Sequence, residues 1–316
     1  MTYKAEAASA SAWHDYRPPL FVVPGMPRAG TTFLYHNLQK HPQIFLPYRK
    51  EIDYFNEIYH FRGLDWFLSL YREIRSGQIA GDLSPACWFD PNAIQYIKQY
   101  GYGVKVILAI REPAENTYSL YVQKLSSNYD IPKSFQDFMS NGYTSRLTNK
   151  GKGVNFVFSN KAYIENIENY KRAFERNLLV YDFRLFRQNN LAVLQAIEDF
   201  LGLNQWFTPY NYDARRINES YRRNIKFLNY LSTSESLRDF VEKHVPRLVT
   251  MRIRSFIDRI SVKTRQKDNT RQTHHEEYIN LAKKRFAIAD NYYHDLFRDN
   301  PIFLGDGSPF KIRNAA

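Results

Sequence analysis

Residues 20–42 read LFVVPGMPRAGTTFLYHNLQKHP, and this stretch decides the fold. Its start, residues 20–23, has the apolar composition of a buried strand, and the apolar spacing after Thr32 is helical. Between the two lies a turn that contains Arg28 and Gly30. Glycine lets a backbone approach an anion closely, and the start of a helix offers unpaired N–H groups and the positive end of its dipole. The stretch therefore predicts a strand, a phosphate-binding turn and a helix.

The turn differs at one position from the loop that binds nucleoside triphosphates. Residues 25–32, GMPRAGTT, fit the pattern G-x-x-x-x-G-x-[ST], but Thr31 stands where those loops carry Lys. The nearest cation is Arg28, inside the turn. The sequence therefore favours a phosphate site that does not serve ATP and magnesium. A kinase-like enzyme that uses a nucleoside triphosphate stays open as an alternative.

A second strand–turn–helix unit follows later in the chain. Residues 104–110, VKVILAI, form a nearly unbroken apolar run, which is typical of a central parallel strand buried on both faces. Arg111 follows this strand directly, and Ser119 lies about two turns along the next helix. In open α/β sheets, ligands bind at the carboxyl ends of the strands. The two units together predict a site for a ligand with two separated phosphates.

The rest of the chain alternates between strand-like and helical patterns. This alternation predicts a three-layer α/β fold, in which a mostly parallel central sheet lies between helices. A flexible polar arm over residues 1–17 precedes it, and residues 18–316 are expected to form a single domain. Residues 126–160 are predicted to be a long loop with one short helix near Phe135. Further helices are predicted over residues 63–75, 91–100, 162–174, 190–201, 218–260 and 276–297, and further extended segments over residues 43–46, 78–82 and 178–181.

The composition narrows the classes of partner. The formal net charge is +12 and the pI is about 9.5, which favours anionic ligands, nucleic acid or a membrane surface. A non-catalytic binder of nucleic acid is a second alternative, although no recognised nucleic-acid motif is present and no such partner is expected. No apolar run is long enough for a membrane span. The single cysteine, Cys87, excludes an intrachain disulfide and, without a signal-peptide pattern at the start, favours a cytoplasmic location.

Two motifs carry a resemblance to a known family. The first is residues 27–32, PRAGTT, and the second is Arg111, Pro113, Ser119 and Tyr121 in the pattern R-x-P-x-x-x-x-x-S-x-Y. Their order and separation match, so the chain resembles the sulfotransferases that use 3′-phosphoadenosine 5′-phosphosulfate (PAPS). The pattern is most similar to the heparan-sulfate-type and related bacterial enzymes. Further counterparts within residues 20–200 are His41-Pro42, Lys50-Glu51, Tyr54-Phe55, Ser84-Pro85 and Tyr181-Asp182.

The resemblance implies a donor, a product and a reaction. A sulfuryl group would move in line from PAPS to a hydroxyl and leave adenosine 3′,5′-bisphosphate; no metal is required, and the sequence has no His/Cys ligand cluster. The residues implied to bind the donor are Arg28, Ala29, Gly30, Thr31, Thr32, Arg111, Ser119, Lys263 and Arg265. The first five surround the 5′-phosphosulfate, Arg111 and Ser119 bind the 3′-phosphate, and the last two belong to a late basic loop that closes over it.

Two residues are implied to be catalytic. Arg28 would stabilise the charge that develops on the leaving phosphate, and this help is electrostatic because arginine keeps its proton at neutral pH. Glu51 matches the base that takes the proton of the acceptor hydroxyl. Leu83 stands where members that modify glycans often carry Lys, which argues against a strongly anionic polysaccharide acceptor. The acceptor is expected to be a hydroxyl of a saccharide, a lipid or a secondary metabolite.

The same residues also have purely structural interpretations. Arg28 could be an ordinary surface side chain in a tight turn. Ser119 could lie on the solvated face of its helix. Arg111 could form a surface ion pair with Glu115, and Glu51 could form one with Lys50 or Arg49. Such pairs contribute little to stability.

Overall fold

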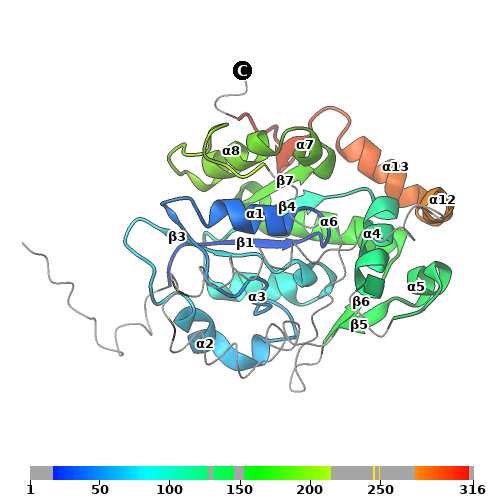
Figure 1. Cartoon of the computed structure of the whole chain (residues 1–316), viewed down its shortest axis with the longest axis horizontal. Helices are drawn as coiled ribbons and strands as arrows, with labels where there is room; N and C mark the ends of the chain where they lie inside the picture. Colours follow the sequence, from blue (N-terminus) through cyan, green and yellow to red (C-terminus); the bar gives the residue numbers. More distant parts are fainter. Residues whose placement is uncertain are drawn as a thin grey trace, which may run out of the picture.

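Figure 1 shows the computed structural model of the chain, which describes residues 17–126, 131–145, 153–214 and 275–312 and the single residues 245 and 249. The predicted arm, Arg17 apart, lies outside the described residues. So do almost all of the helix predicted over residues 218–260 and both late donor candidates, Lys263 and Arg265.

A six-stranded sheet forms the centre of the described structure. Neighbouring strands pair in parallel, except that β8 runs antiparallel to β7. The mostly parallel sheet predicted from the sequence is therefore confirmed. From one edge to the other the strands are β2 (Ile44–Phe45), β3 (Ile79–Asp82), β1 (Leu20–Gly25), β4 (Lys105–Ile110), β7 (Leu178–Asp182) and β8 (Ile302–Leu304).

The strand order reverses beside β1. The chain leaves β1 toward β2 and β3 on one side, and then crosses to β4 on the other side. In open α/β sheets, ligands bind outside the carboxyl ends of the strands at such a switch point. The topology therefore places a candidate site between the ends of β1 and β4.

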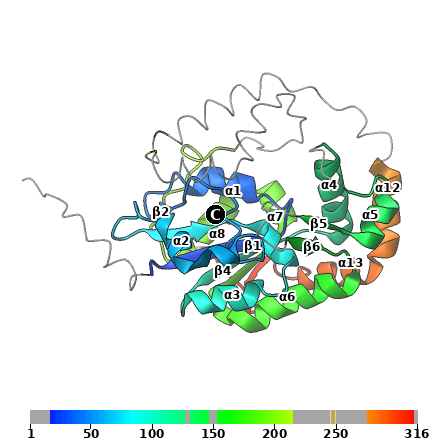
Figure 2. The same ribbon diagram turned by 90° about the horizontal axis from the view of Figure 1, so that it is seen from below.

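Helices cover both faces of the sheet, which gives the three layers expected from the sequence. Figure 2 shows α1 (Thr31–Leu38) on one face, and α3 (Ala93–Tyr100) and α6 (Asn160–Phe174) on the other. Helix α8 (Asn190–Leu201) lies on the face of α1. Its Glu198 pairs with His41, which follows α1, and Oε1 lies 3.3 Å from Nε2.

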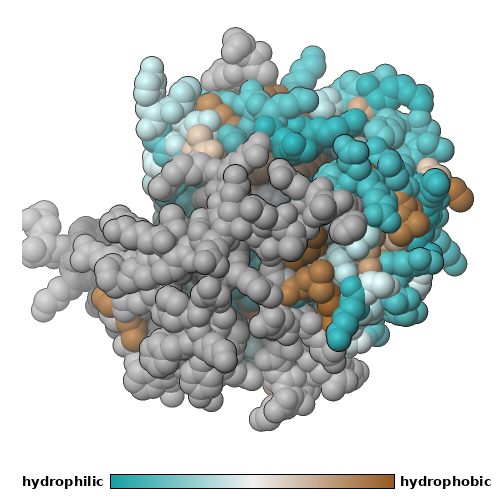
Figure 3. Space-filling model, turned by 45° about the vertical axis from the view of Figure 1, so that its right-hand side comes forward, coloured by the Kyte–Doolittle hydropathy of each residue, from teal (hydrophilic) through white to brown (hydrophobic). Residues whose placement is uncertain are grey.

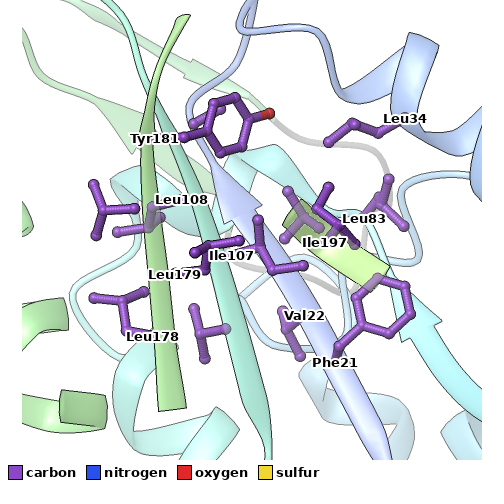
Figure 4. Packing of buried hydrophobic residues seen from close by; sticks show 14 of the residues in the cluster. Phe21, Val22, Leu34, Leu83, Ile107, Leu108, Leu178, Leu179, Tyr181 and Ile197 are labelled. Atoms are coloured by element: carbon purple, nitrogen blue, oxygen red, sulfur yellow. The ribbon is translucent and has the colours of Figure 1, made fainter. Parts of the chain in front are cut away.

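The core follows from the apolar runs of three neighbouring strands. All residues of β1 and β7 are buried, and in β4 only Lys105 is partly exposed. Burying one such aliphatic or aromatic side chain contributes about 1.5–3 kcal/mol, so the strands whose ends carry the candidate site are firmly fixed. Figure 4 shows their packing against α1 and α8 through Phe21, Val22, Ile107, Leu108, Leu178, Leu179, Leu34 and Ile197.

A second hydrophobic cluster lies beyond the carboxyl end of β1, on the right of Figure 1. It is rich in aromatic rings, among them Tyr118, Phe135, Phe138 and Phe156. The elements that form it are α4 (Pro113–Ser126), α5 (Phe135–Asn141), β5 (Tyr143–Ser145), β6 (Val154–Phe156) and α12 (His275–Arg285). The remaining described helices are α2 (Gly63–Ser69), α7 (Phe183–Gln188) and α13 (Ala287–Leu296), with short 3-10 turns at His60–Arg62, Pro85–Phe89 and Glu175–Asn177.

The prediction of one long helix over residues 276–297 is wrong, because the segment forms two helices, α12 and α13. The break falls at Phe286, whose backbone leaves the helical region at φ −102° and ψ 21°. Before the break, Ile279 and Ala282 pack in the second cluster, whereas Ala289 and Tyr293 after it pack in the main core. A straight helix could not reach both cores.

Three smaller differences concern edges and loops. The predicted loop over residues 126–160 contains α5, as expected, but also the antiparallel pair β5–β6. Helix α2 ends at Ser69 instead of continuing to residue 75. Strand β8 was not predicted, because its three residues give too short an apolar pattern to stand out.

The surface has a mixed character. On the face in Figure 3, the residues that are coloured are mostly hydrophilic, with hydrophobic residues scattered among them. Large exposed hydrophobic side chains in the described residues include Phe61, Tyr102 and Ile288, which come from separate elements. No described helix has the length and apolar composition that crossing a membrane would need.

Candidate active site

The turn between β1 and α1 is fixed by a hydrogen bond to the neighbouring strand β4. The N–H of Met26 donates to the carbonyl of Ala109 in β4, 3.0 Å away, and the N–H of Ala29 donates to the carbonyl of Met26 at 3.2 Å. Arg28 has a φ of 64° and Gly30 a φ of 87°, so both adopt the left-handed conformation. Because that conformation is costly for a residue with a side chain, Arg28 is held there by its surroundings.

The start of α1 is open toward this turn, as predicted. Gly30 is the N-cap and has no side chain that could bond to the first-turn N–H groups. Thr31 and Thr32 are the first two residues of the helix, and Thr31 is buried. Their N–H groups and the positive end of the helix dipole are suited to a phosphate.

Gly30 is also required by packing. A Cβ atom at this position would lie 2.8 Å from Cζ of Phe186 in α7. The Phe186 ring has little room to move, because it packs edge-on against Phe33 at 5.1 Å and stacks with Phe183 at 5.4 Å between centroids. The predicted phosphate-binding turn and α7 can therefore pack this closely because Gly30 has no side chain.

We expect Gly30→Ala to destabilise the protein more than Gly77→Ala. Gly77 has a similar φ of 79°, but a Cβ atom there would meet nothing within 4 Å, so its variant carries only the backbone strain. The additional clash at Gly30 should cost about 1–3 kcal/mol, as overpacking usually does. Urea unfolding of both variants measures the difference. Equal losses would show that Phe186 moves aside freely.

The two cationic turns are joined directly by hydrogen bonds. Nε of Arg28 donates to Oγ of Ser119 in α4 at 3.1 Å, and a terminal nitrogen of Arg111 donates to the carbonyl of Arg28 at 2.9 Å. The amide of Asn116 donates to the carbonyl of Pro27 at 2.7 Å. The structure thus brings together three predicted site residues, Arg28, Arg111 and Ser119, at the switch point between β1 and β4.

Arg111 has a structural contact as well as a place in the site. It pairs with Glu115 at 3.1 Å, as the structural interpretation expected, and its guanidinium lies 5.0 Å from the ring centroid of Phe183. Burial lowers the pKa of Arg111 from its ordinary value, while Glu115 opposes that change and Arg187 in α7 reinforces it. Arginine remains charged in proteins, so Arg187 adds a second positive charge near that of Arg111. Sequence reasoning missed Arg187, which belongs to neither motif.

Glu51, the predicted base, lies in the segment between β2 and α2. Glu51 and Asp53 have φ values of 60° and 57°, both left-handed. The N–H of Asp53 donates to Oγ of Ser84 at 2.9 Å, and that hydroxyl donates to Asp82 at 2.5 Å. Asn56 donates to the Asp53 carboxyl at 2.9 Å. These bonds fix the segment to the end of β3, next to the predicted Ser84-Pro85 counterpart.

The carboxyl groups near Glu51 differ in their ionisation. Burial raises the pKa of Asp53 to about 8, with a further contribution from the charge of Glu51, and burial raises that of Asp82 to about 7. Asp53 is therefore mostly neutral at neutral pH. The side chain of Glu51 is 46% exposed and accepts from the ammonium of Lys50, which is the ion pair that the structural interpretation foresaw. Exposure leaves the Glu51 carboxylate reachable by a substrate.

Comparison with known proteins decides the family. The model of the sulfotransferase domain matches residues 18–268. The chain belongs to the sulfotransferase family. A solved relative in fold is the sulfotransferase from Alicyclobacillus acidocaldarius, with a TM-score of 0.50 and 19% identity over 72% of this chain and 96% of that one. The assignment made from the two motifs is therefore confirmed.

Two curated sulfotransferases illustrate the range of relatives. Membrane-associated sulfotransferase kil1 of Dictyostelium discoideum is 34% identical over 37% of this chain and 26% of its own length. Heparan sulfate glucosamine 3-O-sulfotransferase 3B1 of Mus musculus is 27% identical over 60% of this chain and 47% of its own length. This sulfotransferase thus spans about a quarter of the length of the first relative and about half of the length of the second.

Lys124 is a second residue that sequence reasoning missed. It lies in the last turn of α4, five residues after Ser119, and Nζ is 5.3 Å from the ring centroid of Tyr143. Burial lowers the pKa of Lys124 to about 8, while the charges of Glu51 and Asp53 oppose this change. The only signal in the sequence is its position on the helix that carries the second motif.

In the described part of the sulfotransferase, neither the cysteine nor a cluster of metal-ligating side chains adds further chemistry. Cys87 is buried, and burial raises the pKa of its thiol well above the ordinary value, which disfavours the reactive thiolate. Within the part of the chain that is described, no group of three or more His, Cys, Asp or Glu side chains could hold a metal ion.

Proposed function

We propose that this sulfotransferase moves the sulfuryl group of PAPS to a hydroxyl acceptor and releases adenosine 3′,5′-bisphosphate. The observation that carries the proposal is the bond from Arg28 to Ser119, together with that from Arg111 to the carbonyl of Arg28. They join two cation-bearing turns at the carboxyl ends of β1 and β4. A nucleotide with phosphates at both its 5′ and 3′ positions has the charge pattern that these turns would bind.

Each residue has a defined part in the proposed reaction. Glu51 takes the proton as the acceptor oxygen forms its bond to sulfur and the bond from sulfur to the bridging phosphate oxygen breaks. Arg28 stabilises the negative charge that grows on that phosphate oxygen. The N–H groups of Thr31 and Thr32 hold the 5′-phosphate. Arg111 holds the 3′-phosphate, and none of these steps calls for a metal ion.

A saccharide is the acceptor class that we favour over a lipid or a secondary metabolite. The mouse relative is named for sulfation of a glucosamine in heparan sulfate. Of the rings of Phe89, Phe156 and Tyr143, whose centroids lie 4.4 Å and 4.5 Å apart, Phe89 is the one that is partly exposed and open to an acceptor.

The test is transfer of label from [35S]PAPS to a panel of acceptors: N-sulfoheparosan oligosaccharides, neutral oligosaccharides, simple phenols and a hydroxysteroid. We expect labelled product from at least one saccharide, and calorimetric binding of adenosine 3′,5′-bisphosphate. Binding of ATP with magnesium and transfer of its phosphate would support the kinase-like alternative instead. Affinity for oligonucleotides that falls steeply with salt, without preference for the bisphosphate, would support the nucleic-acid alternative.

A further inference from the structure

Arg111, the cation proposed to hold the 3′-phosphate, is already bonded to a carboxylate. Its Nη2 donates to Oε2 of Glu115 at 3.1 Å, and Glu115 lies four residues later, in the first turn of α4. The side chain of Arg111 is 15% exposed and that of Glu115 is 30% exposed, so both are partly buried but reachable from solvent. A phosphate that binds Arg111 therefore meets the Glu115 carboxylate at the same guanidinium.

Glu115 is not needed to hold Arg111 in place. Nη1 of Arg111 donates to the carbonyl of Arg28 at 2.9 Å, and the guanidinium lies 5.0 Å from the ring centroid of Phe183. The backbone of Arg111 is fixed as well, because its carbonyl accepts from the hydroxyl of Tyr163 at 3.1 Å. These contacts come from the β1–α1 turn, α7 and α6, and all of them would remain without Glu115.

The fold also gains little from Glu115. Solvent screens an ion pair between partly exposed side chains, so such a pair contributes little to stability. A carboxylate in the first turn of α4 is favoured by the helix dipole, but the start of this helix has a second carboxyl. Asp290 of α13 accepts a hydrogen bond from the backbone of Ala114 there. A structural role therefore leaves the position of Glu115 unexplained.

The other charges near Arg111 face different partners or have the opposite sign. The carboxylate of Glu112 pairs with Lys283 of α12 at 3.5 Å. Arg187 of α7 adds positive charge. Among the described residues, the carboxylate that is hydrogen-bonded to the Arg111 guanidinium is that of Glu115.

The effect that remains for Glu115 is electrostatic. A carboxylate bonded to Arg111 cancels part of the charge that attracts a phosphate, and it also repels the phosphate itself. On the basis of the proposed function, we propose that Glu115 competes with the 3′-phosphate for the Arg111 guanidinium and thereby limits the affinity for adenosine 3′,5′-bisphosphate. This competition lets the product leave after each transfer.

The test needs no acceptor. Binding of adenosine 3′,5′-bisphosphate and of adenosine 5′-monophosphate is measured by calorimetry in the wild type, Glu115→Gln and Glu115→Asp. We expect Glu115→Gln to bind the bisphosphate about three- to tenfold more tightly, with a slower dissociation in stopped-flow displacement, because the carboxylate no longer competes. Affinity for the monophosphate, which lacks the 3′-phosphate, should not change. Glu115→Asp keeps the charge and should stay nearer to the wild type.

Two further variants show whether the effect runs through Arg111. Glu165→Gln is the matched control, because Glu165 also pairs with a cation four residues earlier, Lys161 of α6, at 3.7 Å. This control should leave both affinities unchanged. In an Arg111→Gln background, the gain from Glu115→Gln should shrink, since the guanidinium for which the two anions compete is gone.

Weaker or unchanged binding of the bisphosphate by Glu115→Gln would overturn the proposal, and a weaker affinity would make Glu115 a residue that orients Arg111. Equal gains for the bisphosphate and the monophosphate, or with and without Arg111, would also overturn it, because the carboxylate would then act only as a general negative charge. Failure of the wild type to bind the bisphosphate would contradict the proposed function and this inference with it, whereas each of the other results concerns Glu115 alone.

Discussion

Replacing Arg28 with alanine is expected to lower kcat for sulfuryl transfer by about 10²–10³-fold, the usual cost of removing one donor that stabilises developing charge. Arg28 is held in a left-handed conformation and bonded to Ser119, so its guanidinium has a defined place between the two turns. The affinity for adenosine 3′,5′-bisphosphate should fall far less, because Arg111 and the N–H groups at the start of α1 remain. Steady-state rates with [35S]PAPS and calorimetry with the product measure the two effects.

Arg75→Ala is the matched control for this variant. Arg75 is exposed in the turn before β3, at the amino ends of the parallel strands and so at the opposite edge of the sheet. Its loss should leave both kcat and product affinity unchanged. Arg28→Lys should recover part of the activity, since a cation returns without the planar fork. If Arg28→Ala turned over like the wild type, Arg28 would be an ordinary arginine in a tight turn.

The framework of the fold was predictable because its signals are local. The apolar runs that became β1, β4 and β7 are buried on both faces, and Gly202 ends α8 at the predicted residue in a left-handed conformation. The break at Phe286 was not predictable in the same way. No proline or glycine marks it, and it arises because the two halves of the segment pack on different cores.

The meeting of the two motif-bearing turns was predictable to a similar degree, whereas the surroundings of Glu51 were not. Arg28, Arg111 and Ser119 each follow a recognisable strand and belong to motifs with fixed spacing, and the topology brings them together. Lys124 depends on an unpredicted hairpin, because Tyr143 and Phe156 belong to β5 and β6. The pKa of Asp53, about 8, depends on burial that no pattern in the sequence records.

Glu51 is the residue whose substitution should separate catalysis from binding. In Glu51→Gln the side chain keeps its size and its ability to accept a hydrogen bond but can no longer take a proton. We expect kcat to fall by about 10²–10⁴-fold, the range for general-base catalysis. Product affinity should stay within about threefold, because the donor-side residues belong to another segment and exposed single charges contribute little to stability.

The control and the pH dependence decide between this role and a simple ion pair with Lys50. Glu73→Gln removes an exposed carboxylate from the turn before β3, away from the carboxyl ends of the strands, and should change neither rate nor affinity. Wild-type kcat/KM should rise with pH as the base becomes ionised, and the small residual rate of Glu51→Gln should lack that rise. If Glu51→Gln reacted at the wild-type rate, the Glu51 carboxylate would serve only as an ion-pair partner of Lys50. If rate, product affinity and thermal stability all fell together, Glu51 would have a structural role. Only a loss of rate alone, with the acidic limb gone, identifies Glu51 as the base.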